Sequence, residues 1–506
     1  MFCKAPLYSL GILAAFSSTA LAQEKSTVFL DSTAQVIRGF GAANIVTWRP
    51  DMTEGEMETA FGVGEGQLGF SILRLRIAPN QNQWSVNLPS ARRANEMGVT
   101  IIGSPWSPPA SMKTNNNLIG GELRDDMFDD YAAHLDAFNT YMDNEGVPIY
   151  AVSVQNEPDI QVSYESCDWS PEAMRKFMAE NAGSIGTRVI APESFQFRKQ
   201  MSDPILNDSA ATANLDILGG HIYGGGLASY PLAEEKGKEL WMTEHLVLET
   251  DLEANIGTAY EIQRVMKAGM SAYIWWYIVR FYGPIADDEN EDYRKGEITK
   301  RGYMMSQFSR FIRPGFVRIH TQGPDLRSGV STTAYRDSSN VVIVAINTSE
   351  SSKEVSFTLD GGSAGPLKRY VTSETQDVEE LGPVEVSQGG FTVTLGPNSA
   401  TTFVADYSAV SSENDAVPGS SSQLLQNYPN PFRSLTTIGY NVPQAGEVTL
   451  EVFDLLGRKV RTLESGFLSA GRREVAFEAS GLSPGMYVFQ LSVGDSVETR
   501  MMTLVE

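Results

Sequence analysis

Two glutamates, Glu157 and Glu244, each close a short apolar run that is rich in β-forming residues. Glu157 ends the run at 150–157 and is followed by Pro158, and Glu244 ends the run at 239–244. Two facing carboxylates are the groups that hydrolyse a glycosidic bond, one as acid/base and one as nucleophile. We predict that Glu157 is the acid/base and Glu244 the nucleophile. Two surface ion pairs are the alternative interpretation.

The elements that position these glutamates follow an alternating pattern. Helical patterns, as at Arg124–Asn144, from Ser170 and at Ala254–Gly269, separate most of a series of short apolar runs. These runs do not alternate strictly, which is typical of strands buried on both faces of a parallel sheet. The eight predicted strands are Ile37–Ala43, Ile72–Ile77, Thr100–Trp106, Tyr150–Glu157, Arg188–Glu193, Leu215–Tyr223, Glu239–Glu244 and Ala272–Ile278.

This pattern predicts an α/β fold, a (β/α)8 TIM barrel over residues 37–312. Glu157 then ends the fourth strand and Glu244 the seventh, at the barrel end that carries the chemistry. Asn156 can hydrogen-bond the 2-hydroxyl of a sugar. His221 and Tyr223, which end the sixth strand, are expected to hydrogen-bond Glu244 and hold it ionised and oriented.

Aromatic and basic side chains near the strand ends are candidates for holding a sugar. Trp106, Trp169, Trp276 and Tyr282 can stack on sugar faces, although ordinary wall packing is the alternative for the tryptophans. Arg280 follows the eighth strand, and its planar guanidinium suits a sugar carboxylate. The alternative for Arg280 is a pair with a nearby acid, such as Asp287 or Asp288, which stand a few residues further on.

The remaining sequence predicts β-rich modules and an export signal. Lys4, the apolar segment 7–16 and an Ala-x-Ala motif at 20–22 indicate a signal peptide. Alternating strands joined by Gly, Ser and Asn turns follow Pro314, and a Ser-rich stretch separates them from a second strand-rich region. We predict a signal peptide at 1–22, a strand at 23–36 that joins the side domain, an all-β side sandwich at 313–407, a linker at 408–423 and a small β-sandwich tail at 424–506.

Composition excludes several classes of partner. The net charge of −23 argues against nucleic acid, whose phosphates need a basic surface. No segment after the signal peptide is long and apolar enough to span a membrane. Cys3 leaves with the signal peptide, so Cys167 is a single thiol, and the four histidines lie far apart in sequence. We therefore predict no metal and no cofactor, and we expect a monomer.

Several motifs around these residues resemble glycoside hydrolase family 30, and in particular its bacterial glucuronoxylan-cleaving xylanases. The resemblance covers nearly all of residues 27–406. The motifs are GFSILR at 69–74, SPWSPP at 104–109, SVQNEPD at 153–159, RVIAPES at 188–194, KELWMTE at 238–244, WWYI at 275–278 and FIRPG at 311–315. The resemblance implies a TIM barrel with an attached β-sandwich, retaining chemistry at Glu157 and Glu244, and a secreted endo-β-1,4-xylanase that acts on glucuronoxylan.

In these xylanases an Arg and a Tyr after the eighth strand hold the carboxylate of a 4-O-methylglucuronic acid branch. Arg280 and Tyr282 match those positions. Phe281 stands where the family usually has Ser, Leu246 where it has Tyr, and Glu249 where it has a small polar residue. A negative charge at Glu249 would weaken uronate binding unless Arg280 outweighs it.

Other activities of the family are the alternatives: a xylobiohydrolase, a xylanase that does not need glucuronate, a β-glucosidase or β-xylosidase, or a β-1,6-glycanase. A non-catalytic surface carbohydrate-binding protein would lack one of the two glutamates. The tail motifs LLQNYPNPF at 424–432, VFDLLGR at 452–458 and LSPGMY at 482–487 resemble the C-terminal sorting domain of the type IX secretion system. This implies that the type IX machinery is a partner and that the protein is secreted, or attached to the cell surface after export.

Overall fold

The computed structural model describes residues 24–324, 328–409 and most of 423–504, except 425–426, 428–431, 433–434, 443–445, 455–456, 469–470 and 495. The predicted signal peptide and residues 410–422 of the predicted linker lie outside the described residues. The chain divides into two compact units, Met1–Val410 and Ser411–Glu506.

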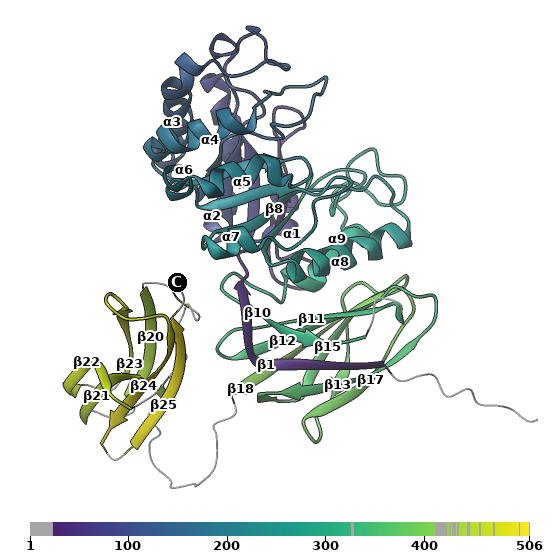
Figure 1. The fold of residues 1–506 in the computed structure, drawn as a ribbon. Coiled ribbons are helices and arrows are strands. Elements are labelled where there is room, and N and C mark those ends of the chain that lie inside the picture. The colour runs from purple at the N-terminus through teal and green to yellow at the C-terminus, as the bar shows by residue number, and fades with distance from the viewer. Residues whose placement is uncertain are drawn as a thin grey trace, which may run out of the picture. The chain divides into compact units, whose positions relative to one another are not determined.

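Eight parallel strands close into a barrel, drawn in purple to teal in Figure 1. This confirms the predicted barrel. Its strands are β2 (Gly39–Ala43), β3 (Ile72–Arg76), β4 (Thr100–Ser104), β5 (Ala151–Ser153), β6 (Arg188–Ser194), β7 (Ile217–His221), β8 (Glu239–Glu244) and β9 (Met270–Trp275). Each overlaps one predicted strand, and β8 has the predicted bounds.

The strands alternate along their length, which places different residue types at different levels inside the barrel. Apolar side chains form a separate inner cluster: Ile72, Ile102, Ala151, Ile190, Ile217, Trp241, Ala272 and Ile274. Two residues further along three of these strands come Arg74, Ser104 and Ser153, all fully buried. The polar groups of the site therefore lie one level above an apolar plug, at the carboxyl end of the strands.

Glycine makes room where two strands carry bulky groups. An added Cβ at Gly219 in β7 would lie 2.5 Å from Ile190 Cγ2 and 3.3 Å from Glu193 Cγ. A side chain there would collide with the apolar plug and crowd the Glu193 carboxylate. The close approach therefore favours glycine at this point of the barrel.

Helices cover the outside of the barrel, and their starts follow the sequence signals. Ser170 caps α4, with its hydroxyl accepting from the Ala173 backbone N–H, and Asp251 caps α8 in the same way through Ala254. The helices are α1 (Glu54–Phe61), α2 (Leu88–Glu96), α3 (Phe128–Asn144), α4 (Pro171–Glu180), α5 (Lys199–Asn207), α6 (Ser209–Ala213), α7 (Pro231–Glu235), α8 (Leu252–Lys267) and α9 (Lys300–Ser309).

A ten-stranded sheet forms the side domain and encloses its own apolar core. It takes in β1 (Glu24–Val36), which pairs with β10 and β13, so the N-terminal strand joins this sheet. The other strands are β10 (Val317–Gln322), β11 (Val330–Arg336), β12 (Asn340–Asn347), β13 (Lys353–Asp360), β14 (Gly362–Ala364), β15 (Leu367–Thr372), β16 (Glu379–Val384), β17 (Gly390–Leu395) and β18 (Ser399–Ala409).

Strand β12 is buried on both faces, because one face packs on the barrel. Val341, Ile343 and Ala345 join the core of the side sheet. Val342, Val344 and Ile346, which point to the other face, join the barrel's main core. Polar contacts fix this packing: Gln263 Nε2 of α8 donates to the Val344 carbonyl at 2.8 Å. The side domain is thus held firmly against α8 and α9 (Figure 1).

The second unit is a small all-β domain with its own core. Its two sheets contain β19 (Gln423–Leu424), β20 (Leu435–Val442) and β23 (Gly471–Glu478), and β21 (Gly446–Asp454), β22 (Lys459–Leu468), β24 (Gly485–Val493) and β25 (Ser496–Leu504). Across the described residues of the whole chain, no helix has the length and apolar character needed to cross a membrane.

Candidate active site

The Glu157 side chain is positioned by a tight loop rather than by a strand. Strand β5 ends at Ser153, four residues earlier than predicted, because the backbone leaves the sheet to make other bonds. The Asn156 N–H donates to the Pro105 carbonyl at 2.8 Å, and the Glu157 N–H donates to the Glu193 carbonyl at 3.1 Å. Glu157 itself has φ +48°, a left-handed conformation that costs free energy in a residue other than glycine.

Glu157 is held from two sides. Its Oε1 lies 3.0 Å from His221 Nδ1, and its Oε2 accepts a hydrogen bond from the Tyr164 hydroxyl at 3.0 Å. Glu157 is 5% exposed, whereas Tyr164 is 46% exposed. Tyr164 therefore links the carboxylate to the open side of the site.

Glu244 ends β8 and receives two donors. Arg74 Nη1 donates to Oε2 at 2.6 Å, and the Tyr223 hydroxyl donates to Oε1 at 2.9 Å. The expected Tyr223 contact is thus present. His221 Nδ1 lies 4.0 Å from Glu244 Oε1, beyond hydrogen-bond distance. The expected His221 bond to Glu244 is therefore wrong: the loop after β5 brings Glu157 closer to the imidazole.

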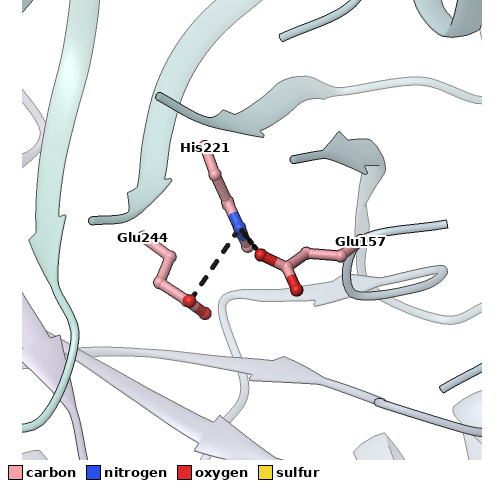
Figure 2. A group of neighbouring side chains, drawn as sticks. All are labelled: Glu157, His221 and Glu244. Atoms are coloured by element: carbon pink, nitrogen blue, oxygen red, sulfur yellow. Dashed lines mark hydrogen bonds and ion pairs between the residues drawn. The ribbon is translucent and has the colours of Figure 1, made fainter. Parts of the chain in front are cut away.

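Figure 2 shows Glu157 and Glu244 converging on His221. One oxygen of each carboxylate and a ring nitrogen of His221 all lie within 4.8 Å of one another. In glycosidases, carboxyl groups about 5–5.5 Å apart are typical of retention, and separations of about 6.5–9.5 Å are typical of inversion. The spacing is closer to the retaining range than to the inverting range, and it favours a nucleophilic role for one carboxylate.

Arg74 and Glu193 were not among the predicted site residues, although both are fully buried at its centre. Besides Glu244, Arg74 donates from Nη2 to Asn156 Oδ1 at 2.6 Å and to Glu193 Oε1 at 3.1 Å, and from Nε to Ser104 Oγ at 3.1 Å. Sequence signals for both existed. Arg74 interrupts an apolar strand, and Glu193 closes a predicted strand just as Glu157 and Glu244 do.

The charges in this network nearly balance. Burial would lower the pKa of His221, but Glu244, Glu157 and Glu193 raise it to about 9, so the imidazole is protonated at neutral pH. Burial would raise the pKa of Glu193, but Arg74 and His221 lower it to about 2. Burial raises the pKa of Glu244, and Glu157 adds to this, whereas His221 and Arg74 oppose it.

Glu157, His221 and Glu244 lie close enough to be tested as a cation site. Their chemistry disfavours one. A protonated His221 has no lone pair to offer, and the Arg74 guanidinium already binds Glu244 at 2.6 Å. The same three groups suit proton transfer instead.

The predicted aromatic residues fall in two places. Trp106 and Trp276 pack together with ring centroids 5.6 Å apart, and Trp48, 38% exposed, contacts both. The Arg74 guanidinium lies 4.8 Å from the Trp106 ring centroid, so these tryptophans adjoin the network of Arg74, Glu157 and Glu244. Trp106 itself is only 2% exposed and packs within the protein. Trp276 and Trp48 are the more exposed rings.

Trp169 belongs to the packed interior. Its ring contacts Phe128, Tyr131 and Phe177, and it is 5% exposed. These rings come from α3 and α4, and together they fix the segment just before α4. The burial favours the packing alternative for Trp169 over sugar stacking.

Arg280 follows β9 and is bound by acids. Its Nη1 lies 2.9 Å from Asp287 Oδ2 and 2.7 Å from Glu289 Oε1. The guanidinium lies 5.9 Å from the ring centroid of Tyr282, which is 6% exposed. The acid-pair alternative is thus realised through Asp287, and Glu289 is an unpredicted second partner.

A closed eight-stranded barrel with two carboxylates held close together at its carboxyl end defines a glycoside hydrolase. The comparisons with known proteins agree. Residues 65–234 match the model of the glycosyl hydrolase family 30 TIM-barrel domain, and residues 426–504 match that of the secretion system C-terminal sorting domain.

The chain is 42% identical over 406 residues to the glucuronoxylanase XynC of Bacillus subtilis strain 168. The matched region covers 77% of this chain and 94% of that protein. The crystal structure of a family 30 endoxylanase from Clostridium papyrosolvens C71 matches at 40% identity and a TM-score of 0.68, over 76% of this chain and 100% of that one. The family 30 subfamily 8 xylanase Xyn30A from Clostridium acetobutylicum matches at 36% identity and a TM-score of 0.71, over 76% and 99%. The chain belongs to glycoside hydrolase family 30.

Proposed function

We propose that this protein is a secreted retaining endo-β-1,4-xylanase that hydrolyses glucuronoxylan. The observation that carries the proposal is the pair Glu157 and Glu244, with one oxygen of each within 4.8 Å of the other at the barrel mouth. Identity of 42% to a glucuronoxylanase over most of the chain supports the substrate. Xylan is the proposed partner, and no cofactor is needed for this chemistry.

The proposed reaction has two steps. Glu244 attacks the anomeric carbon and forms a covalent glycosyl-enzyme while Glu157 gives its proton to the leaving oxygen. Glu157 then takes a proton from water, which attacks the same carbon and releases Glu244. Asn156, whose Oδ1 accepts a hydrogen bond from Arg74, is the proposed partner of the sugar 2-hydroxyl.

The charge count supports these roles. Glu157, Glu193 and Glu244 would carry three negative charges against two positive charges on Arg74 and His221. These five groups are close to charge balance, and a single proton is enough to make the network neutral. Arg74 donates to Glu244 at 2.6 Å and Tyr223 donates at 2.9 Å, and both bonds stabilise the ionised form that a nucleophile needs.

The residues after β9 supply the proposed branch site. Arg280 and Tyr282 lie side by side. Burial raises the pKa of Tyr282 to about 12, with Arg280 opposing the rise and Glu244 adding to it. A uronate held there would be near the catalytic glutamates. Trp276 is the proposed sugar-stacking ring, and Trp106 supports it from behind.

The tail directs the protein out of the cell. The match of residues 426–504 to a secretion system sorting domain supports export, and we propose the type IX machinery as its partner. The exported protein is then extracellular or attached to the cell surface. The monomeric state stays a prediction.

The test is a product profile on glucuronoxylan and on unsubstituted xylan, with the wild type and Arg280→Ala. We expect mixed oligosaccharide lengths from xylan and a larger loss for Arg280→Ala on glucuronoxylan than on unsubstituted xylan. Xylobiose alone would contradict the endo mode. Equal losses on both substrates would remove Arg280 from branch recognition, and no cleavage of either would overturn the proposed activity.

A further inference from the structure

The Arg280 guanidinium already binds two carboxylates of its own chain. Asp287 Oδ2 and Glu289 Oε1 both contact Nη1, at 2.9 and 2.7 Å. Glu289 also binds Arg49 Nη1 at 3.1 Å. Two positive and two negative charges therefore balance at this point, and little positive charge is left over for an acidic ligand.

The two acids differ in how firmly they are held. The Asp287 side chain is 14% exposed, and its Oδ1 also accepts the Glu289 backbone N–H at 3.0 Å, so it shapes the loop. The Glu289 side chain is 53% exposed, and among the described residues its carboxylate forms ion pairs with the two arginines alone. Glu289 can therefore leave Arg280 by rotating into solvent, without unfolding the loop.

A hollow borders this cluster. It has a volume of about 340 Å³ and is lined by Leu248, Thr250, Phe281, Glu289, Glu291 and Asp292, among others. Arg280 lies 5.1 Å from the centroid of the Phe281 ring. The volume is in the range of ligand sites, but three acids line it. Of these lining residues, Glu289 is the one whose carboxylate also binds Arg280.

We propose that Glu289 determines specificity by occupying Arg280 as an internal carboxylate that an acidic substituent of the substrate must displace. The inference rests on the proposed xylanase function. It predicts that the chain, with Arg280 and Tyr282 in place, accepts neutral xylan as well as glucuronoxylan. The ligand is a uronate because a carboxylate can replace a carboxylate at Nη1 with the same geometry.

The test compares Glu289→Gln with Glu291→Gln, which removes the same charge from a neighbouring exposed position on the hollow. Steady-state kinetics are measured for the full chain on glucuronoxylan and on unsubstituted xylan. We expect Glu289→Gln to lower KM on glucuronoxylan about threefold to tenfold, with kcat unchanged and no change on unsubstituted xylan, as for loss of a partly exposed ion pair. Methyl glucuronide should inhibit this variant at correspondingly lower concentration. Glu291→Gln lowers the negative charge of the hollow without freeing Arg280, so its effect on KM should be much smaller than that of Glu289→Gln.

A second comparison separates recognition from general electrostatics. In the Arg280→Ala background, Glu289→Gln should leave KM and kcat unchanged on both substrates. The guanidinium for which the two carboxylates compete is then absent. Equal effects of Glu289→Gln and Glu291→Gln, or an effect that survives Arg280→Ala, would overturn the inference. Both of these outcomes require an enzyme that cleaves xylan. They are therefore distinct from failure of the proposed function, in which the wild type cleaves neither glucuronoxylan nor unsubstituted xylan.

Discussion

The catalytic centre and the Arg280 cluster both join an arginine to two acids, but they do so at different depths. The side chains of Arg74 and Glu193 are 0% exposed and that of Glu244 is 8% exposed. In the other cluster the Arg280 side chain is 14% exposed and that of Glu289 is 53% exposed. The acids bound to Arg74 are buried and fixed, whereas the partly exposed Glu289 can leave Arg280.

Burial explains this difference. In a low-dielectric interior, each charge depends on its partner, and removal of one leaves an uncompensated buried ion. At the surface, water and salt replace a lost partner at little cost. A site that must hold a nucleophile in one position needs the first arrangement, and a site that must release one carboxylate for another needs the second.

The largest effect is expected from Glu244→Gln, which keeps the shape of the side chain and removes its charge. Turnover on xylan should fall on the order of 10⁴-fold or more, because the nucleophile is lost. The control is Glu239→Gln, at the opposite end of the same strand, where Glu239 binds Arg38 instead. That variant should keep activity within severalfold of wild type. Near-wild-type turnover by Glu244→Gln would contradict the nucleophile assignment.

The next largest effect is expected on stability, from Arg74→Met. This change leaves Glu193 and Glu244 buried without their cation and should cost about 3–5 kcal/mol of unfolding free energy, measured by urea denaturation. The double variant Arg74→Met/Glu193→Gln should recover part of the loss, since it removes one of the stranded charges. A single-variant loss below about 1 kcal/mol would mean that the network is not interdependent.

The pH dependence of unfolding tests the same network. The pKa of His221 is about 9 in the folded protein and ordinarily 6.5, so its contribution is complete below pH 6.5 and is lost as pH rises through 9. That shift corresponds to about 3 kcal/mol. The pKa of Glu193, about 2 against 4.5, adds stability above pH 4.5 that is lost toward pH 2.

We therefore expect the unfolding free energy of the wild type to fall between pH 6.5 and 9 more steeply than that of His221→Asn. Chemical denaturation at pH 6 and pH 9 measures the difference. Parallel pH profiles for the two proteins would show that His221 is not the titrating group.

The smallest effect is expected from Arg49→Gln, which removes the second partner of Glu289. Because the Glu289 side chain is half exposed, the change in unfolding free energy should stay below about 1 kcal/mol. The difference from wild type should shrink further in high salt. A loss as large as that of Arg74→Met would mean that the Arg280 cluster is a fixed structural element, and the contrast between the two regions would fail.

Much of the site could be predicted because local sequence patterns determine it. Apolar runs with turn residues marked all eight barrel strands, and Glu244 was placed at a strand end because β8 ends there. Ser170 predicted the start of α4, because serine is a common N-cap residue and caps this helix. Glu193 could have been found by the rule that identified Glu244, whereas Tyr164 sits in a loop with no periodic signal.

The sequence by itself determined the order of strands and helices and marked Glu157 and Glu244 as candidates, since periodicity and strand ends are local properties. Only the tertiary structure decided which groups meet. Barrel closure brings Arg74 of β3 to Glu244 of β8, 170 residues away, and the bent loop at Glu157 brings its carboxylate to His221. Ion pairs between distant segments depend on how the strands close in space, and no local pattern encodes that distance.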